Sequence, residues 1–261
     1  MNEILKDYQP ITLEEMKDVR LMNRTDTKFV TTVAKLRQLL QMASKDYRVQ
    51  EIKGERIAPY YTVYFDTPDF DMFNVHQCGH CNRQKLRIRS YVDSHLNFLE
   101  IKTKNSHGRT RKSRVSMKTF DPTNPDHDIL FEAQNEEFKV YNEFLNEHLA
   151  YAPESLHEQL ENNFNRITLV NNNKTERLTI DMNLCFHNLG TSRSVNLDNL
   201  AIIELKRDGL EPSPVLEMLR KLRIHPLGFS KYCLGTAFTN DHIRANRFKP
   251  RLRTIEKMMQ Q

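Results

Sequence analysis

The sequence predicts an α+β fold with about eight mostly antiparallel strands. Two observations predict it: strand-like segments follow one another at the spacing of hairpins, and amphipathic helical patterns lie between and after them. No segment repeats, and no stretch rich in proline, glycine or serine marks a boundary. We therefore expect a single domain over residues 1–261.

The helices are predicted from caps and from the spacing of apolar residues. Thr12 and Glu15 form a capping box that opens a short helix to about Met22. Thr32 is expected to cap a second helix, in which Leu36, Leu39 and Leu40 recur at helical spacing. The other predicted helices cover residues 70–76, 135–149, 212–222 and 230–238.

The strands are predicted from segments rich in β-branched and aromatic residues. The predicted strands cover residues 26–31, 60–65, 85–92, 98–104, 111–118, 164–170, 177–184 and 200–206. A turn is expected at 77–82 and a loop at 120–128.

The composition is that of a globular protein, with 38% hydrophobic and 9% aromatic residues. Seven glycines and the absence of GxGxxG and GxxxxGK[ST] motifs argue against a glycine-rich phosphate loop. Four cysteines form no disulfide framework, which favours a reducing compartment. The N-terminus lacks the pattern of a signal peptide, and no apolar run approaches the roughly 20 residues that cross a bilayer. We therefore expect a cytoplasmic protein.

Most of the predicted strands alternate between an apolar face and a charged face, on which basic residues predominate. In 85–89, for example, Lys85, Arg87 and Arg89 share one side and Leu86 and Ile88 the other. The remaining charged-face residues are Asp26, Lys28, Glu100, Lys102, Lys112, Arg114, Lys118, Arg177, Asp181, Glu204 and Lys206.

Two architectures explain this alternation. An open sheet with helices on its apolar face would leave the charges in solvent. A closed barrel with the charges inside would place like charges opposite each other, which destabilises a sheet unless an anion neutralises them. Forked guanidinium and ammonium groups suit a polyanion with many oxygens, and the minority carboxylates suit a bridging Mg²⁺ or Mn²⁺.

Eight short motifs follow one another through nearly the whole chain. They are 24–29 (RTDTKF), 63–66 (VYFD), 83–91 (RQKLRIRSY), 100–102 (EIK), 112–114 (KSR), 177–181 (RLTID), 204–206 (ELK) and 229–232 (FSKY). In this order they resemble the catalytic domain of the vacuolar transporter chaperone (VTC) family. These are polyphosphate polymerases of the triphosphate tunnel metalloenzyme, or CYTH-like, superfamily.

The resemblance implies a closed antiparallel β-barrel of about eight strands, a tunnel with helices packed outside. It also implies transfer of the terminal phosphate of ATP onto a growing polyphosphate chain, with Mn²⁺ or Mg²⁺ required. The positions matching the phosphate-gripping residues are Lys28, Arg87, Arg89, Lys102, Lys112, Arg177 and Lys231. Ser230 matches a neighbouring hydroxyl and Glu204 the metal-binding carboxylate. The other charged-face residues supply further candidates, Lys85, Arg114 and Lys206 for the substrate and Glu100 and Asp181 for the metal.

Two departures from the family pattern bear on function. Hydrolases and cyclases of the superfamily usually begin with an E-x-E-x-K strand, whereas residues 24–28 carry one carboxylate, Asp26, which favours synthesis over hydrolysis. After Asp181, where the polymerases tend to carry another basic residue, this chain has Cys185 and His187. One phosphate contact is therefore missing or comes from Arg193.

Three functions remain as hypotheses at this stage. Polyphosphate synthesis, with ATP and polyphosphate or pyrophosphate as partners, is favoured over hydrolysis of tripolyphosphate or a nucleoside triphosphate. The third is a non-catalytic polyanion-binding module. Nucleic acid is not expected as a partner, because the charged faces show almost no aromatic residue apart from Tyr91. A membrane partner protein is left open.

Three further signals have competing interpretations. His76, Cys78, His80 and Cys81 have spacing compatible with zinc, but a solvated turn is favoured because no second pair lies at finger spacing. Asp66 is expected to cap the following helix rather than to bind a metal. The basic segment 244–253 could contact nucleic acid or a membrane surface, form a solvated helix, or guide polyphosphate.

Overall fold

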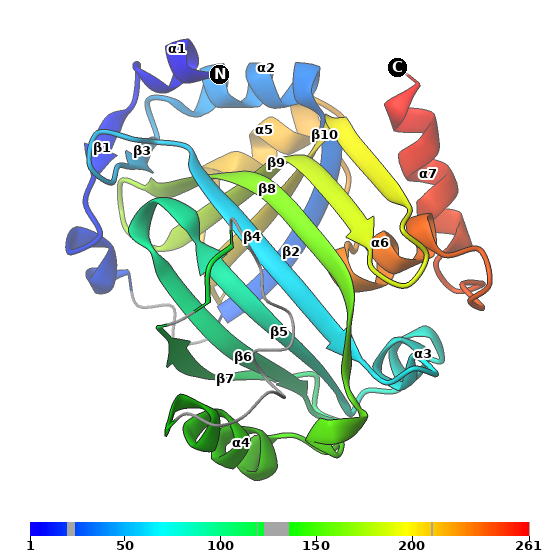
Figure 1. Ribbon diagram of the computed structural model, residues 1–261. Helices are drawn as coiled ribbons and strands as arrows, with labels where there is room; N and C mark the ends of the chain where they lie inside the picture. Colours follow the sequence, from blue (N-terminus) through cyan, green and yellow to red (C-terminus); the bar gives the residue numbers. More distant parts are fainter. Residues whose placement is uncertain (20–23, 119, 123–135, 210, 261) are drawn as a thin grey trace.

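The computed structural model describes residues 1–19, 24–118, 120–122, 136–209 and 211–260 (Figure 1). Its described residues form one ten-stranded sheet in which the main path runs β2-β10-β9-β8-β4-β5-β6-β7 and every pair on that path is antiparallel. The strands are β1 (Gln9–Ile11), β2 (Arg24–Thr32), β3 (Tyr47–Gln50), β4 (Ala58–Asp66), β5 (Arg83–Tyr91), β6 (Leu96–Lys104), β7 (Thr110–Met117), β8 (His157–Asn171), β9 (Glu176–Asn188) and β10 (Ser194–Asp208). Strand β1 pairs in parallel with β3, and β3 pairs with β8.

The expected closed barrel is wrong, because the sheet does not close. β2 and β7, the two ends of the path, do not pair with each other in the part of the chain that the structure describes. β7 is an edge strand whose Arg111, Lys112 and Arg114 are exposed. Such charges are the usual protection of a sheet edge against further pairing.

The sheet nevertheless curls strongly, so that distant strands face one another. The segment Phe229–Ser230 contacts both sides: Lys28 of β2 donates a hydrogen bond to the Phe229 carbonyl at 2.9 Å, and Lys85 of β5 donates to Ser230 Oγ at 2.6 Å. We call the side of the sheet that carries these lysines the inner face.

Helices cover the outer face in two groups. The helices are α1 (Asn2–Leu5), α2 (Val33–Ala43), α3 (Asp71–Gln77), α4 (Glu136–His148), α5 (Pro214–Lys221), α6 (Lys231–Thr239) and α7 (Lys249–Met259). α1, α2 and α5 pack on the apolar side chains of β2 and β8–β10, such as Ile180 and Ile203, while α4 packs on those of β5–β7. None of the helices in the described residues is long and apolar enough to span a membrane.

α3, α6 and α7 lie together and cover one end of the inner face (Figure 1). α6 approaches the sheet closely at Gly235, where an added Cβ would lie 2.5 Å from Phe186 and 2.7 Å from Leu160. The predicted role of Asp66 is confirmed, because its carboxylate accepts hydrogen bonds from the backbone N–H groups of Met72 and Phe73 at the start of α3.

Most of the predicted elements are confirmed, with longer strands than expected at β8, β9 and β10. Thr32 caps α2 through its hydroxyl, and the capping box is present, with the Thr12 N–H donating to Glu15 at 2.8 Å. The turn that this box opens is a short 3₁₀ helix, Glu15–Asp18, rather than an α-helix. Its expected end at Met22, and most of the expected loop 120–128, fall outside the described residues.

Candidate anion-binding site on the inner face

The register of the strands brings the predicted charged residues together on the inner face. Across β5, β6 and β7, Lys85 lies opposite Lys102, which lies opposite Lys112. Across β2, β10 and β9, Lys28 lies opposite Glu204, and Asp26 opposite Lys206, which lies opposite Arg177. The alternation found in the sequence therefore describes one continuous surface.

Glu100 is the counter-charge of the β5–β7 side. Its side chain is fully buried, and Arg87 donates from Nε and Nη2 to Oε2, at 2.9 and 2.6 Å, while Lys112 donates to Oε1 at 3.0 Å. Burial alone would raise the pKa of Glu100, but Arg87, Arg89 and Lys112 lower it to about 2. The carboxylate is ionised, and both of its oxygens are engaged by cations.

Asp181 plays the same part on the β8–β9 side. Arg166 donates to both of its oxygens, at 2.6 and 2.9 Å, and Lys231 of α6 pairs with Oδ2. Although burial opposes ionisation, Arg166 and Lys231 hold the pKa of Asp181 well below its usual range. Arg166 is a site residue that was not predicted from the sequence. It shows the same alternation, since Arg166 and Thr168 face inward while Ile167 and Leu169 face the core.

Lys102 and Arg89 are inner-face cations that form no ion pair with a carboxylate in the part of the chain that the structure describes. Within the described residues the side chain of Lys102 forms no hydrogen bond or ion pair, and the buried Arg89 Nε has no hydrogen-bond partner. The charge of Arg87, then burial and the charge of Arg89, holds the pKa of Lys102 well below its usual value. A buried positive field without a matching carboxylate is a site for an anion.

The carboxylate of Glu204 is less engaged by basic side chains than those of Glu100 and Asp181. Lys206 lies 3.6 Å from Oε2, and the carboxylate is about a fifth exposed. Burial raises the pKa of Glu204, but Lys28, Lys206 and Lys102 lower it to about 2, so it is ionised. No group of three or more His, Cys, Asp or Glu side chains that could hold a metal by itself occurs in the described residues.

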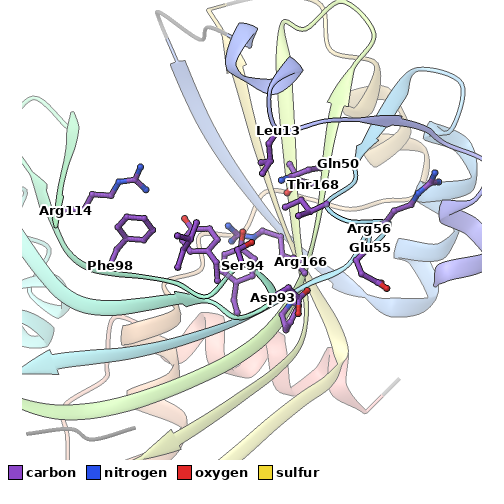
Figure 2. Close-up of a pocket in the computed structure, with 16 residues that line it drawn as sticks. Leu13, Gln50, Glu55, Arg56, Asp93, Ser94, Phe98, Arg114, Arg166 and Thr168 are labelled. Atoms are coloured by element: carbon purple, nitrogen blue, oxygen red, sulfur yellow. The ribbon is translucent and has the colours of Figure 1, made fainter. Parts of the chain in front are cut away.

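One end of the inner face opens into a cavity of about 240 Å³ (Figure 2). Three aromatic rings line it: the centroid of Tyr91 lies 4.9 Å from that of Tyr60 and 5.9 Å from that of Phe98. Arg166 and Arg114 also line the cavity, from its two sides. Arg166 lies over the Tyr60 ring at 4.8 Å and Arg114 over Phe98 at 4.4 Å. The expectation that the charged face carries almost no aromatic residue besides Tyr91 is therefore wrong, since Tyr60 of β4 and Phe98 of β6 lie beside it.

Three alternatives from the sequence can be placed. Arg193 pairs with Asp241 on the exposed surface. His76 turns toward Cys233, with Nδ1 at 2.9 Å from Sγ, while Cys78 and Cys81 are exposed. In the part of the chain that the structure describes, the zinc alternative therefore has no set of ligands.

Proton uptake is expected when tripolyphosphate binds near pH 8. Burial lowers the pKa of Lys231 to about 7, so its amine is largely neutral there, and a bound polyanion favours the charged form. Calorimetry in buffers of different ionisation enthalpy measures the number of protons taken up. This number should be smaller for the Lys231→Arg variant, because arginine is already protonated before the ligand binds. Equal uptake by the variant and the wild type would contradict the assignment to Lys231.

The described residues thus form a curled antiparallel sheet with a largely cationic inner face. Residues 23–240 match the family model of the VTC domain, and the chain belongs to this family. No curated protein sequence matches this chain.

Two solved structures illustrate what the fold is similar to. A Bacillus halodurans protein described as a proposed adenylate cyclase is 14% identical, with a TM-score of 0.50, over 80% of this chain and 96% of that one. A Hippeastrum protein, described as a proposed adenylyl cyclase with a dominant triphosphatase activity, is 17% identical, with a TM-score of 0.49, over 84% of this chain and 97% of that one. At these identities the likeness concerns the fold alone.

Proposed function

We propose that this protein transfers the terminal phosphoryl group of ATP onto a growing inorganic polyphosphate chain held on the inner face. The observation that carries the proposal is the excess of inner-face cations around Lys102 and Arg89, neither of which forms an ion pair with a carboxylate in the described residues. Membership of the VTC domain family supports chemistry on phosphate chains, by transfer or by hydrolysis. The single carboxylate of β2, Asp26, favours transfer.

The proposed reaction needs position and charge rather than a protein nucleophile. A terminal oxygen of the polyphosphate chain attacks the γ-phosphorus of ATP, the bond from that phosphorus to the β–γ bridging oxygen breaks, and ADP leaves with the electron pair. The cations assigned to the phosphates are Lys28, Arg87, Arg89, Lys102, Lys112, Arg177 and Lys231, with Lys85, Arg114, Lys206 and Ser230 as further contacts. Arg166 joins them because it lies between the cavity and Asp181.

The inner face fits a divalent cation that arrives with the phosphates. Mg²⁺ is usually bound through one or two carboxylates together with substrate phosphates, and Mn²⁺ takes similar oxygen ligands. Glu204 would hold it, because both oxygens of Glu100 and of Asp181 are already engaged by basic side chains. When bound, the cation would neutralise charge that develops on the transferred phosphoryl group.

The aromatic cavity favours a nucleotide as the phosphate donor. Its volume of about 240 Å³ and the rings of Tyr60, Tyr91 and Phe98 suit a base that stacks, and Arg166 continues from the cavity into the row of inner-face cations. Figure 2 shows Phe98 and Arg114 on one side of the pocket and Arg56 on the other.

Tyr91→Leu should therefore weaken the binding of ATP about tenfold, since stacking on an aromatic side chain is worth ~1–3 kcal/mol per base. Tripolyphosphate, which has no base, should bind the variant as it binds the wild type. Competition between the two ligands for the wild type and the variant measures this. An equal loss for both ligands would mean that Tyr91 acts on the phosphate site.

Incubation of the purified protein with ATP and Mn²⁺, with and without pyrophosphate as primer, tests the proposed function. Long polyphosphate on a gel, lost in Arg87→Ala and Lys102→Ala, is the expected result. Free phosphate without polymer would show hydrolysis instead. Tight polyphosphate binding with neither product would show a binding module, and both of these outcomes reject synthesis.

A further inference from the structure

A row of basic residues continues from the inner face to the surface at the start of β5. Arg83 is the first residue of β5 and lies two residues before Lys85, so both project from the same side of the strand, about 7 Å apart. Lys85 belongs to the inner face through its hydrogen bond to Ser230 Oγ at 2.6 Å. Arg87 and Arg89 continue the same row inward.

The fold brings two arginines from the C-terminal segment to this point. The Arg247 guanidinium lies directly on Gly79, where an added Cβ would be 1.8 Å from Nη1. The Arg251 guanidinium lies beside Gly228, 3.7 Å from the position of an added Cβ. The Arg247 N–H also donates to Gln77 Oε1 at 3.1 Å, which ties the start of α7 to the end of α3. We call Arg83, Arg247 and Arg251 the outer cluster.

His76 shows that the outer cluster and the inner face are neighbours. Its Nδ1 lies 2.9 Å from Cys233 Sγ, and the Cys233 N–H donates to Ser230 Oγ at 3.2 Å. Burial, followed by the charges of Lys85 and the three outer-cluster arginines, lowers the pKa of His76 to about 2. The histidine is therefore neutral and adds no charge of its own at this point.

The outer cluster lacks a counter-charge. Among the described residues, none of its arginines forms an ion pair with a carboxylate, although other surface basic residues such as Lys6, Lys17 and Lys221 do. Guanidinium groups bind phosphate oxygens through paired hydrogen bonds. Arg247 and Arg251 lie beyond residues 23–240, which the VTC domain matches.

We propose that the outer cluster is a second phosphate-binding site, which holds a polyphosphate chain that extends from the inner face past Ser230 to the surface beside α7. The proposal rests on the proposed function in that the chain on the inner face is taken to be polyphosphate. Nucleic acid fits less well, because the aromatic side chains here, Phe73 and Phe248, are buried and offer no surface for a base. A membrane surface fits less well too, because the apolar side of α7, with Leu252 and Ile255, is packed against the protein.

The test compares a short and a long ligand on the same variants in the absence of ATP. Arg247→Gln with Arg251→Gln should weaken the binding of long-chain polyphosphate roughly tenfold and should reduce the slope of log Kd against log salt concentration by about one to two. Tripolyphosphate should bind within twofold of the wild type, because the cations of the inner face are unchanged. Arg253→Gln is the matched control, since Arg253 lies two residues after Arg251 and about 200° around α7.

Three outcomes would overturn the proposal. Long-chain polyphosphate could bind the double variant as it binds the wild type, or both ligands could weaken equally. A single-stranded oligonucleotide or vesicles of anionic lipid could instead be the ligands whose binding depends on the two arginines. Binding is measured without turnover, so this test is independent of the proposed function. If the protein proved inactive but the double variant still bound long-chain polyphosphate more weakly and tripolyphosphate normally, synthesis would be rejected and the outer cluster would stand.

Discussion

Lys102→Met should lower the rate of phosphoryl transfer by about 10² to 10³ and at the same time raise the melting temperature. Removing one positioned group that stabilises transition-state charge has an effect of this size in other enzymes. The stability should rise because Lys102 has no carboxylate partner in the described residues and lies in the field of Arg87, Arg89 and Lys28. We expect a gain on the order of 1 kcal/mol, which corresponds to about 2–4 °C for a domain of this size.

The pH dependence supplies a second measurement on the same variant. The folded-state pKa of Lys102 is lowered, so between this pKa and the ordinary lysine pKa the unfolded chain binds more protons than the folded one. The free energy of unfolding of the wild type should therefore rise with pH in that interval, and the variant should lose this component. Lys45→Met, on the exposed surface, is the control and should change neither rate nor stability. A Lys102→Met variant that is inactive and less stable than the wild type would contradict the assignment.

Glu100→Gln should destabilise the protein by about 3–5 kcal/mol, the usual result of breaking a buried ion pair by removing one partner. Glu100 is fully buried, and its carboxylate neutralises Arg87 and Lys112. The variant adds net positive charge to the inner face, so tripolyphosphate should raise its melting temperature by more than it raises that of the wild type. Thermal unfolding with and without the ligand measures both effects.

Glu204→Gln is the matched control for Glu100→Gln, because it makes the same chemical change on the same face. Glu204 is about a fifth exposed and its nearest basic group is 3.6 Å away, so the loss of stability should be smaller than in Glu100→Gln. The dependence of turnover on Mn²⁺ should change in Glu204→Gln, while tripolyphosphate binding is retained. Equal destabilisation by the two variants would mean that Glu100 is not the structural counter-charge.

Much of the candidate site could be predicted because it depends on a local rule. In 85–89, 100–102 and 204–206 the period of two in a strand decides which side chains share a face, whatever the strands pair with. Arg166 follows the same rule, because Arg166 and Thr168 alternate with the buried Ile167 and Leu169. The aromatic cavity could not be predicted, since Tyr60, Tyr91 and Phe98 come from three strands and meet through the register of β4, β5 and β6.

The sequence by itself determined that most of the predicted strands carry one apolar and one charged face, and that most of the charges are basic. It could not decide between an open and a closed sheet, and the expected closure is wrong: the sheet curls, but its edges β2 and β7 stay unpaired in the described residues. Only the tertiary structure decided which charges are neutralised. Neutralisation depends on which strands pair and which helix reaches the sheet: Arg87 lies opposite Glu100 across β5 and β6, and Lys231 comes from α6 to Asp181. In the described residues Lys102 and Arg89 form no ion pair with a carboxylate.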